Sequence, residues 1–174
     1  DDETAFNALK KGQIKNKGLI NNQVSSYVFQ YLEKQGIKTH FVAHQSEREM
    51  VCKKLEIIPV EVVVRNRAAG SIVKRLGLEK GLSFKPELVE FFYKSDALGD
   101  PLISEGHIFY FKWANEAELS NMVQASLHVN RVLSKVFDEI GLELIDFKLE
   151  FGKDKSGNVL LGDEFTADGC RLWD

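Results

Sequence analysis

The stretch LIDFKLEFG, residues 144–152, constrains the fold most strongly because apolar and charged residues alternate along it. In a β-strand, successive side chains point to opposite faces, so every second residue shares a face. One face then carries Ile145, Phe147, Leu149 and Phe151, and the other carries Asp146, Lys148 and Glu150. We therefore predict a strand that covers a hydrophobic core on one side and presents an acid, a base and an acid on the other.

The composition excludes several classes of function. With 44% hydrophobic and 28% charged residues, the 174 residues are enough to form a genuine core. The formal net charge of −3 gives no overall attraction to nucleic acid or to an anionic membrane, so we expect neither as a partner. Apolar runs stay far below the roughly 20 residues that span a bilayer, and we expect no signal peptide.

The two cysteines predict the compartment. Cys52 and Cys170 lie far apart, with neither CxxC spacing nor a disulfide framework. A reducing environment is the simplest setting for such a chain, so we predict a cytoplasmic protein.

The order of the expected elements indicates two lobes, with a boundary at Pro59. Residues 1–58 are expected to form a β-rich lobe and residues 59–174 an α/β lobe. Predicted helices cover residues 21–36 and 115–141, and predicted strands cover residues 39–44, 49–59, 61–67, 86–94, 142–151 and 157–165. Residues 97–107 are expected to form a loop because glycine and proline interrupt them.

The long second helix should begin with a capping box of Asn115 and Glu118. Its apolar residues recur at helical spacing and lead directly into the strand at residues 142–151. We expect this apolar stripe to cover the sheet rather than to bind a partner.

Two carboxylates define the first candidate site. Glu150 and Asp163 lie on neighbouring predicted strands, with side chains able to face the same surface. Carboxylates placed close together repel one another unless a cation or a proton lies between them. Mg²⁺ suits such a pair, because it binds a few carboxylate oxygens together with substrate phosphates. The alternative is a solvated sheet face with cross-strand ion pairs.

A second candidate site follows the strand that ends in VVVRNRAAGS. Arg65 and Arg67 lead into Gly70 and Ser71 at the start of a short predicted helix. A guanidinium, a hydroxyl and free amide groups at a helix start favour a phosphate monoester. The alternative is a helix cap flanked by surface arginines.

Arg171 is the third candidate, in DGCRLWD. An arginine next to Trp173 and between acids is commonly structural. It is equally placed to close a phosphate site from the opposite side.

The stretches IIPVEVVVRNRAAGS and LIDFKLEFG resemble the two signature stretches of the SAICAR synthetase (phosphoribosylaminoimidazole-succinocarboxamide synthase) family. The similarity extends to KGLINNQVSS, FFYKSDALGDPLIS and GDEFTADGCRLWD. It implies an α+β, two-lobed ATP-binding fold related to kinases and ATP-grasp enzymes, with an antiparallel β lobe and an α/β lobe. Nucleotide would bind between the lobes.

The resemblance also implies an activity. Members of the family are ligases that join L-aspartate to carboxyaminoimidazole ribonucleotide, consuming ATP with Mg²⁺ in purine biosynthesis. The resemblance implies that the substrate carboxylate is phosphorylated first and then attacked by the aspartate amine. It also implies a homodimer.

Several roles follow from the resemblance for the reacting groups. Glu150 and Asp163 would hold Mg²⁺ and, through it, the ATP phosphates. Lys148 would contact the transferring phosphoryl group or the substrate carboxylate. Asp146 would orient Lys148 or touch the substrate.

Further roles concern the ribonucleotide and the nucleotide. Arg65, Ser71 and Arg171 would hold the ribonucleotide phosphate, and Asp168 would accept a hydrogen bond from the aminoimidazole. The segment 53–59 would be the hinge that packs on adenine, with Lys53 and Lys54 in the ATP site. Lys94, Asp96 and Asp100 would lie in a loop near the substrates, without assigned roles.

The sequence departs from the family at its ends. Family members begin with a hairpin that carries a Gly-Lys-rich loop over the ATP phosphates, and we expect that hairpin to be absent here. They also continue past CRLWD into further helices. We therefore expect both ends to be missing, and the 174 residues alone to bind ATP weakly and turn over poorly.

Two other functions fit the same residues. A small-molecule kinase on a related fold would use a hydroxyl acceptor with a nearby general base. A nucleotide-binding module without turnover is the second alternative.

Overall fold

The computed structural model describes residues 2–5 and 10–174. Its α-helices are α1 (Lys17–Lys34), α2 (Ser71–Leu76), α3 (Glu105–Tyr110) and α4 (Glu116–Asp138), and its 3-10 turns are η1 (Asp96–Leu98) and η2 (Ala167–Gly169). Its strands are β1 (Asp2–Ala5), β2 (Lys10–Gln13), β3 (Phe41–Ser46), β4 (Glu49–Cys52), β5 (Glu56–Arg67), β6 (Ser83–Tyr93), β7 (Leu102–Ile103), β8 (Glu143–Lys153), β9 (Val159–Leu161) and β10 (Cys170–Trp173).

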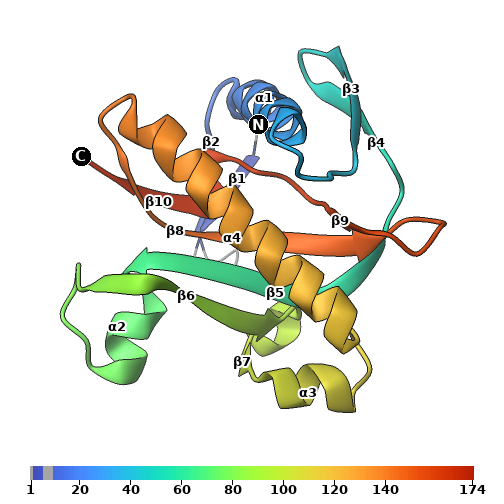
Figure 1. The fold of residues 1–174 in the computed structure, drawn as a ribbon. Helices are drawn as coiled ribbons and strands as arrows, with labels where there is room; N and C mark the ends of the chain where they lie inside the picture. The colour runs from blue at the N-terminus through green and yellow to red at the C-terminus, as the bar shows by residue number, and fades with distance from the viewer. Residues whose placement is uncertain (1, 6–9) are drawn as a thin grey trace.

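A six-stranded antiparallel sheet forms the centre of the molecule (Figure 1). Its strand order is β10-β8-β5-β6-β7, and β9 also pairs with β8. The register between β5 and β8 places Arg65 opposite Asp146 and Glu61 opposite Glu150. Residues directly opposite one another share a face, so the charged residues of both strands lie on one side of the sheet.

The other side of the sheet is the core. Helix α4 crosses this face in Figure 1, with Met122, Val129 and Leu133 buried in the same cluster as Phe147 and Leu149 of β8. The capping box is present, since the Asn115 side chain accepts from the Glu118 amide at 2.9 Å. The prediction that this helix covers the sheet is confirmed.

The N-terminal elements differ from the prediction at their ends. Helix α1 begins at Lys17, four residues before the expected start, and it buries Val28, Phe29 and Leu32. The predicted strand at residues 49–59 is two strands, because β4 ends at Cys52 and β5 begins at Glu56. Asn16 is the N-cap residue, in a left-handed conformation and without a side-chain capping bond.

Pro59, the expected boundary, lies inside β5. The ladder between β5 and β8 is irregular between Ile57 and Glu61, and such an irregularity accommodates a residue without an N–H donor. The division into lobes at residues 58 and 59 stays a prediction.

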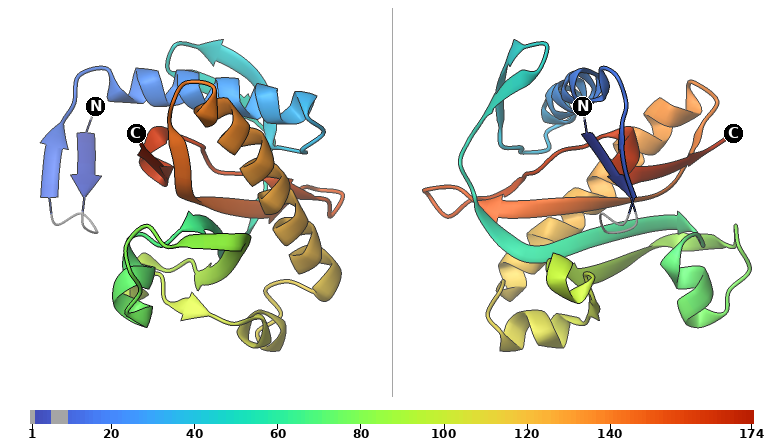
Figure 2. Two further views of the ribbon diagram at one scale, coloured as in Figure 1. Left: turned by 60° about the vertical axis from the view of Figure 1, so that its left-hand side comes forward. Right: turned by 180° about the vertical axis from the view of Figure 1, so that it is seen from behind.

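A pair of strands that the sequence did not predict precedes α1, while the expected absence of a hairpin with a Gly-Lys-rich loop stays a prediction. Strands β1 and β2 pair antiparallel, and Figure 2 shows them projecting from the start of α1. Their sequences, DETA and KKGQ, lack the apolar alternation that signals a strand. Residues 6–9, between the two strands, read FNAL and lie outside the described residues.

Two further segments were also predicted incorrectly. Residues 97–107, expected as a loop, contain most of η1, the short strand β7 and the start of α3. The last strand, β10, was not predicted, and it pairs with the edge of β8. Both contain very short elements whose stability comes from their neighbours rather than from a local pattern. Among the described residues, no helix is long and apolar enough to cross a membrane.

Glu118 provides a test of the packing of α4. Its carboxylate bonds Lys153 Nζ at 2.8 Å and the Asn115 amide at 2.9 Å, and these contacts lower the pKa of Glu118. A lowered folded-state pKa stabilises the fold above the unfolded value of about 4.3, and that gain is lost as the pH falls through the folded value.

We therefore expect Glu118→Gln to lower the free energy of unfolding at pH 7 by about 0.5 kcal/mol, and the difference to close below about pH 4. Urea unfolding over a series of pH values measures it. Glu79→Gln, at an exposed acid, is the matched control. A difference that stays constant with pH would contradict the ion-pair interpretation.

Candidate active site

A cavity of about 540 Å³ lies over the charged face of the sheet. Six of the residues selected from the sequence line it: Arg65, Ser71, Asp146, Lys148, Asp168 and Arg171. They come from β5, α2, β8, η2 and β10, so the antiparallel sheet brings together residues from both signature stretches and from the C-terminal strand. The cavity has an arginine-rich end and a lysine-rich end.

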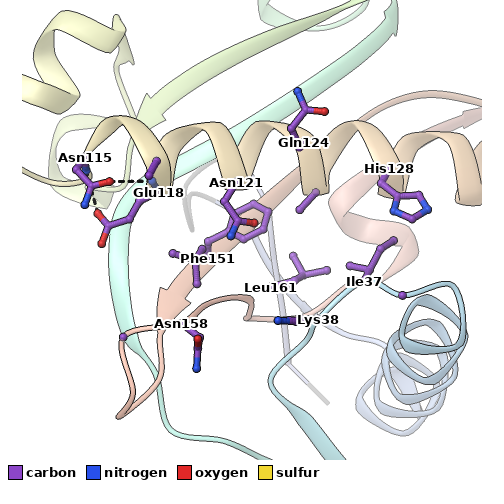
Figure 3. A pocket seen from close by; sticks show the side chains of 15 residues that line it. Ile37, Lys38, Asn115, Glu118, Asn121, Gln124, His128, Phe151, Asn158 and Leu161 are labelled. Atoms are coloured by element: carbon purple, nitrogen blue, oxygen red, sulfur yellow. Dashed lines mark hydrogen bonds between the residues drawn. The ribbon is translucent and has the colours of Figure 1, made fainter.

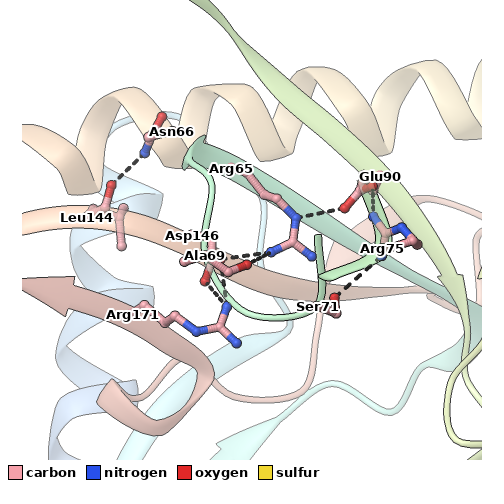
Figure 4. A network of polar contacts seen from close by, with 9 residues as sticks. All are labelled: Arg65, Asn66, Ala69, Ser71, Arg75, Glu90, Leu144, Asp146 and Arg171. Carbon is pink, nitrogen blue, oxygen red and sulfur yellow. Dashed lines mark hydrogen bonds and ion pairs between the residues drawn. The ribbon is translucent and has the colours of Figure 1, made fainter. Parts of the chain in front are cut away.

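Asp146 organises the arginine-rich end (Figure 4). Its carboxylate accepts from Arg65 Nη1 at 2.8 Å and from Arg171 Nη1 at 2.6 and 2.7 Å. The Asp146 side chain is 5% exposed, so both guanidinium groups are fixed by a buried counter-ion. This geometry ties Asp146 to the arginines rather than to Lys148.

Glu90 on β6 holds Arg65 from its other edge. The Glu90 carboxylate accepts from Arg65 Nε at 2.7 Å and also contacts Arg75 Nη2. Arg75 Nη1 donates to Ser71 Oγ at 3.4 Å, so the serine hydroxyl belongs to the same network. Neither Glu90 nor Arg75 was selected from the sequence, because their contacts depend on the pairing of β5 with β6.

Gly70 leaves room for the Arg171 guanidinium because it has no side chain. A Cβ atom on Gly70 would lie 2.4 Å from Arg171 Nη2, and the glycine has φ 64° and ψ −133°. Residues with a side chain rarely adopt this conformation. The helix that follows, α2, is only six residues long, so guanidinium and hydroxyl groups define this end more than a helix dipole does.

Glu61 and Lys148 line the lysine-rich end of the cavity, and Lys94 and Glu150 lie beside that end, outside the lining. Lys148 Nζ contacts the Glu61 carboxylate directly and lies 3.6 Å from Glu150 Oε1. Lys94 Nζ lies 2.7 Å from the same Glu150 oxygen. Glu61 was missed by the sequence analysis, although it precedes Arg65 by four residues on the same strand and therefore shares its face.

Burial and charge act in opposite directions on these groups. Burial raises the pKa of Glu61, and the Lys148 ammonium offsets part of that rise. Burial alone would lower the pKa of Lys148, but the hydrogen bond and charge of Glu61 outweigh it and raise the pKa. The pKa of Lys94 is raised in the same way, against its burial, by Glu150 and Asp163. Both lysines therefore carry their positive charge at neutral pH.

Asp163 lies next to this end but outside the lining of the cavity. The preceding residue, Gly162, donates its N–H to the Glu150 carbonyl at 2.9 Å, which brings Asp163 beside Glu150. Asp163 is exposed and has φ 57°, a left-handed conformation unusual for a residue with a side chain. Within the described residues, no group of three or more His, Cys, Asp or Glu side chains forms a metal cage.

Asp168 is held by helix α1. Its carboxylate contacts Lys17 Nζ and accepts from Asn21 Nδ2 at 3.1 Å, both on α1. The hydrogen bond from Lys17 lowers the pKa of Asp168. This contact links helix α1 to the rim of the cavity.

The predicted hinge lies apart from the cavity. Lys53 lines a separate cavity of about 400 Å³, and Lys54 is exposed beside it in the chain. Leu55, which was not selected, packs on Gly152 and Gly162, next to Glu150 and Asp163. Of the loop residues without roles, Asp100 lines the charged cavity, while Asp96 begins η1.

A larger cavity of about 660 Å³ lies on the opposite side of the sheet (Figure 3). Asn121 and His128 of α4 lie on the side of the helix that faces the end of α1 and the β8–β9 hairpin, and Gln124 also contributes to the lining. The described lining includes no residue that the sequence selected as a site.

Comparison with known proteins decides the family. The SAICAR synthetase family matches residues 1–174 of the chain. The chain belongs to the SAICAR synthetase family. The phosphoribosylaminoimidazole-succinocarboxamide synthase of Desulfitobacterium hafniense is 51% identical over the whole chain, which spans 73% of that relative.

Solved structures agree with this assignment. The crystal structure of the synthase from Ehrlichia chaffeensis has a TM-score of 0.95 and 47% identity, covering 100% of this chain and 75% of that one. A SAICAR synthetase in complex with ADP has a TM-score of 0.96 and 43% identity, covering 100% and 74%. As a member of the SAICAR synthetase family, the chain is an ATP-dependent ligase of purine biosynthesis, and the predicted two-lobed α+β fold class is confirmed.

Gly70→Ala tests the contact with Arg171. We expect the variant to lower the free energy of unfolding by about 1–3 kcal/mol because of its backbone conformation, with a further loss from the displaced guanidinium. In an Arg171→Ala background the second loss disappears, so the cost should be smaller there. Urea unfolding of the unmodified protein, the two single variants and the double variant measures the cost of Gly70→Ala in each background. Equal costs in the two backgrounds would show that Arg171 does not lie over Gly70.

Proposed function

We propose that the charged cavity binds carboxyaminoimidazole ribonucleotide, with its phosphate at the arginine-rich end and its carboxylate at the lysine-rich end. The spacing of these ends supports the assignment. Arg65 and Glu61 are four residues apart on β5, which corresponds to about 13 Å along a strand. That span suits a mononucleotide lying along the strands.

The balance of charge supports the same orientation. Three guanidinium groups, of Arg65, Arg75 and Arg171, share two carboxylates, of Asp146 and Glu90. This end therefore keeps one excess positive charge for a phosphate. Arg171, whose side chain is 48% exposed, and Ser71 are the groups most open to it.

Phosphorylation of the substrate carboxylate is the first chemical step of the proposal. A carboxylate oxygen attacks the γ-phosphorus of ATP, the bond to the ADP oxygen breaks, and an acyl phosphate forms. Lys148 and Lys94 lie where negative charge gathers on the transferring group. Because both lysines are already fixed by carboxylates, little reorganisation is needed when that charge develops.

The amine of L-aspartate then attacks the acyl carbon. The carbon–oxygen bond to phosphate breaks, inorganic phosphate leaves, and the nitrogen loses a proton to give the succinocarboxamide. The activated carbon needs a neutral amine and a water-poor site, since water would compete for it.

Glu150 and Asp163 are the proposed ligands of Mg²⁺. Two adjacent carboxylates without a complete protein cage fit an ion that takes its remaining ligands from nucleotide phosphates and water. When bound, Mg²⁺ supplies positive charge that neutralises the ATP phosphates. The fit rests on the backbone hydrogen bond between Gly162 and Glu150, which brings Asp163 near Glu150, and on the action of both carboxylate charges on Lys94.

The remaining roles rest on family resemblance and stay proposals. Asp168 would accept a hydrogen bond from the aminoimidazole, and the segment with Lys53 and Lys54 would pack on adenine. In our proposal Asp146 acts by fixing Arg65 and Arg171. A homodimer and a cytoplasmic location are expectations from the sequence.

The decisive test is ADP formation by the enzyme with Mg²⁺-ATP and the ribonucleotide, with and without L-aspartate. We expect ADP release that requires aspartate, together with a product that carries the succinyl group. ADP release that is independent of aspartate and yields a phosphorylated hydroxyl compound would instead support a kinase. Nucleotide binding without any product would support a non-catalytic module.

Glu150→Gln tests the metal site. A neutral amide is a poor Mg²⁺ ligand, so we expect the Mg²⁺ concentration that gives half-saturation with ADP to rise on the order of tenfold. Calorimetric titration of ADP at fixed Mg²⁺ concentrations measures it. Unchanged ADP affinity at limiting Mg²⁺ would remove Glu150 from the site.

Arg171→Ala tests the orientation of the ribonucleotide. Loss of a charge-assisted contact to phosphate should raise the ribonucleotide KM on the order of tenfold while the ATP KM stays within about twofold. Steady-state kinetics with each substrate varied in turn gives both values. A larger effect on ATP would place the triphosphate, rather than the ribonucleotide phosphate, at the arginine-rich end.

A further inference from the structure

We propose that Glu61 is a positioning residue, which holds the Lys148 ammonium on its own carboxylate and thereby keeps Glu150 available to a divalent cation. The proposal rests on the proposed function, because it takes Glu150 as a metal ligand. It assigns a role to a buried carboxylate that lines the active-site cavity and lacks one in the scheme above.

The geometry of the two strands creates a competition for Lys148. Glu61 and Glu150 are directly opposite one another on β5 and β8, and each residue is 4% exposed. Side chains in such positions begin about 5 Å apart, so a lysine from the same face reaches either carboxylate. Lys148 lies two residues before Glu150 on the same face of β8.

The observed contacts show how the competition is resolved. Lys148 Nζ is in direct contact with Glu61 and stays 3.6 Å from Glu150 Oε1, at the long end of an ion pair. Lys94 Nζ forms an ion pair with the same Glu150 oxygen at 2.7 Å. Both lysines therefore approach Glu150 from its Oε1 side, which directs a cation toward the other oxygen.

Loss of the Glu61 charge would change this arrangement. Lys148 would lose its nearest counter-ion, while Glu150 is already within ion-pair range and Asp100 acts on the lysine at longer range. An ammonium that moves onto Glu150 neutralises the carboxylate and repels a divalent cation. The consequence is weaker metal binding, produced by a residue that does not touch the metal.

The experiment measures metal binding without turnover. Mn²⁺ serves as the probe, and electron paramagnetic resonance follows its binding to the enzyme in the presence of ADP. We compare Glu61→Gln, Lys148→Met, the double variant and the unmodified enzyme. Glu118→Gln is the matched control, since it also removes a glutamate charge paired with a lysine, and Glu118 lines the cavity on the opposite side of the sheet.

We expect the Mn²⁺ concentration for half-saturation to rise on the order of tenfold in Glu61→Gln and to stay within about twofold in Glu118→Gln. In the Lys148→Met background, Glu61→Gln should change the Mn²⁺ concentration for half-saturation by less than twofold, because the competing ammonium is gone. A purely structural role for Glu61 would not depend on Lys148 in this way.

Two results would overturn the proposal. Unchanged Mn²⁺ affinity in Glu61→Gln would show that Lys148 does not compete for Glu150, and an equal loss in the Lys148→Met background would make Glu61 a direct ligand or a structural residue. If Glu61→Gln does not fold, Glu61→Asp replaces it, with a smaller rise that Lys148→Met again removes. Failure of the proposed reaction is seen separately, as missing product from the unmodified enzyme.

Discussion

The antiparallel pairing of β5 with β8 is the constraint on which the rest of the structure depends. A slip of one residue would turn the charged row of β8 into the core and its phenylalanines into the cavity. The register that avoids this places Arg65 opposite Asp146 and Glu61 opposite Glu150. Packing of α4 against the apolar face thus fixes the partners of the ionic face, although the helix touches none of them.

The ionic face is stable because its buried charges are paired. The side chains of Arg65, Asp146, Glu61 and Glu150 are 4–5% exposed, and each contacts an opposite charge. Removing one member of such a pair typically costs about 3–5 kcal/mol, since the other charge stays buried. The pairing therefore serves two purposes: it makes the fold tolerate these charges, and it sets their positions before any substrate arrives.

The sequence predicted what depends on local pattern. Alternation in LIDFKLEFG predicted both faces of β8, and helical spacing with a capping box predicted α4. The signature stretches indicated which residues meet in the cavity. The sequence could not predict which charged side chains pair with one another. The contacts of Asp146 with two arginines and of Glu61 with Lys148 depend on the register of separate strands. The hairpin β1–β2 was missed because DETA and KKGQ lack the apolar alternation that predicts a strand.

The division of the cavity into two ends follows from residue type as well as position. Arginine occupies the end proposed for phosphate, where a planar guanidinium is held by two carboxylates and still offers N–H groups to an anion. Lysine occupies the end proposed for phosphoryl transfer, where a compact ammonium, held by a carboxylate, offers a point charge to the transferring group. A guanidinium in place of Lys148 would keep the charge but would span both facing carboxylates, Glu61 and Glu150. The point charge of lysine therefore lets Glu61 hold Lys148 while, in our proposal, the Glu150 oxygen that Lys94 does not contact stays open to metal.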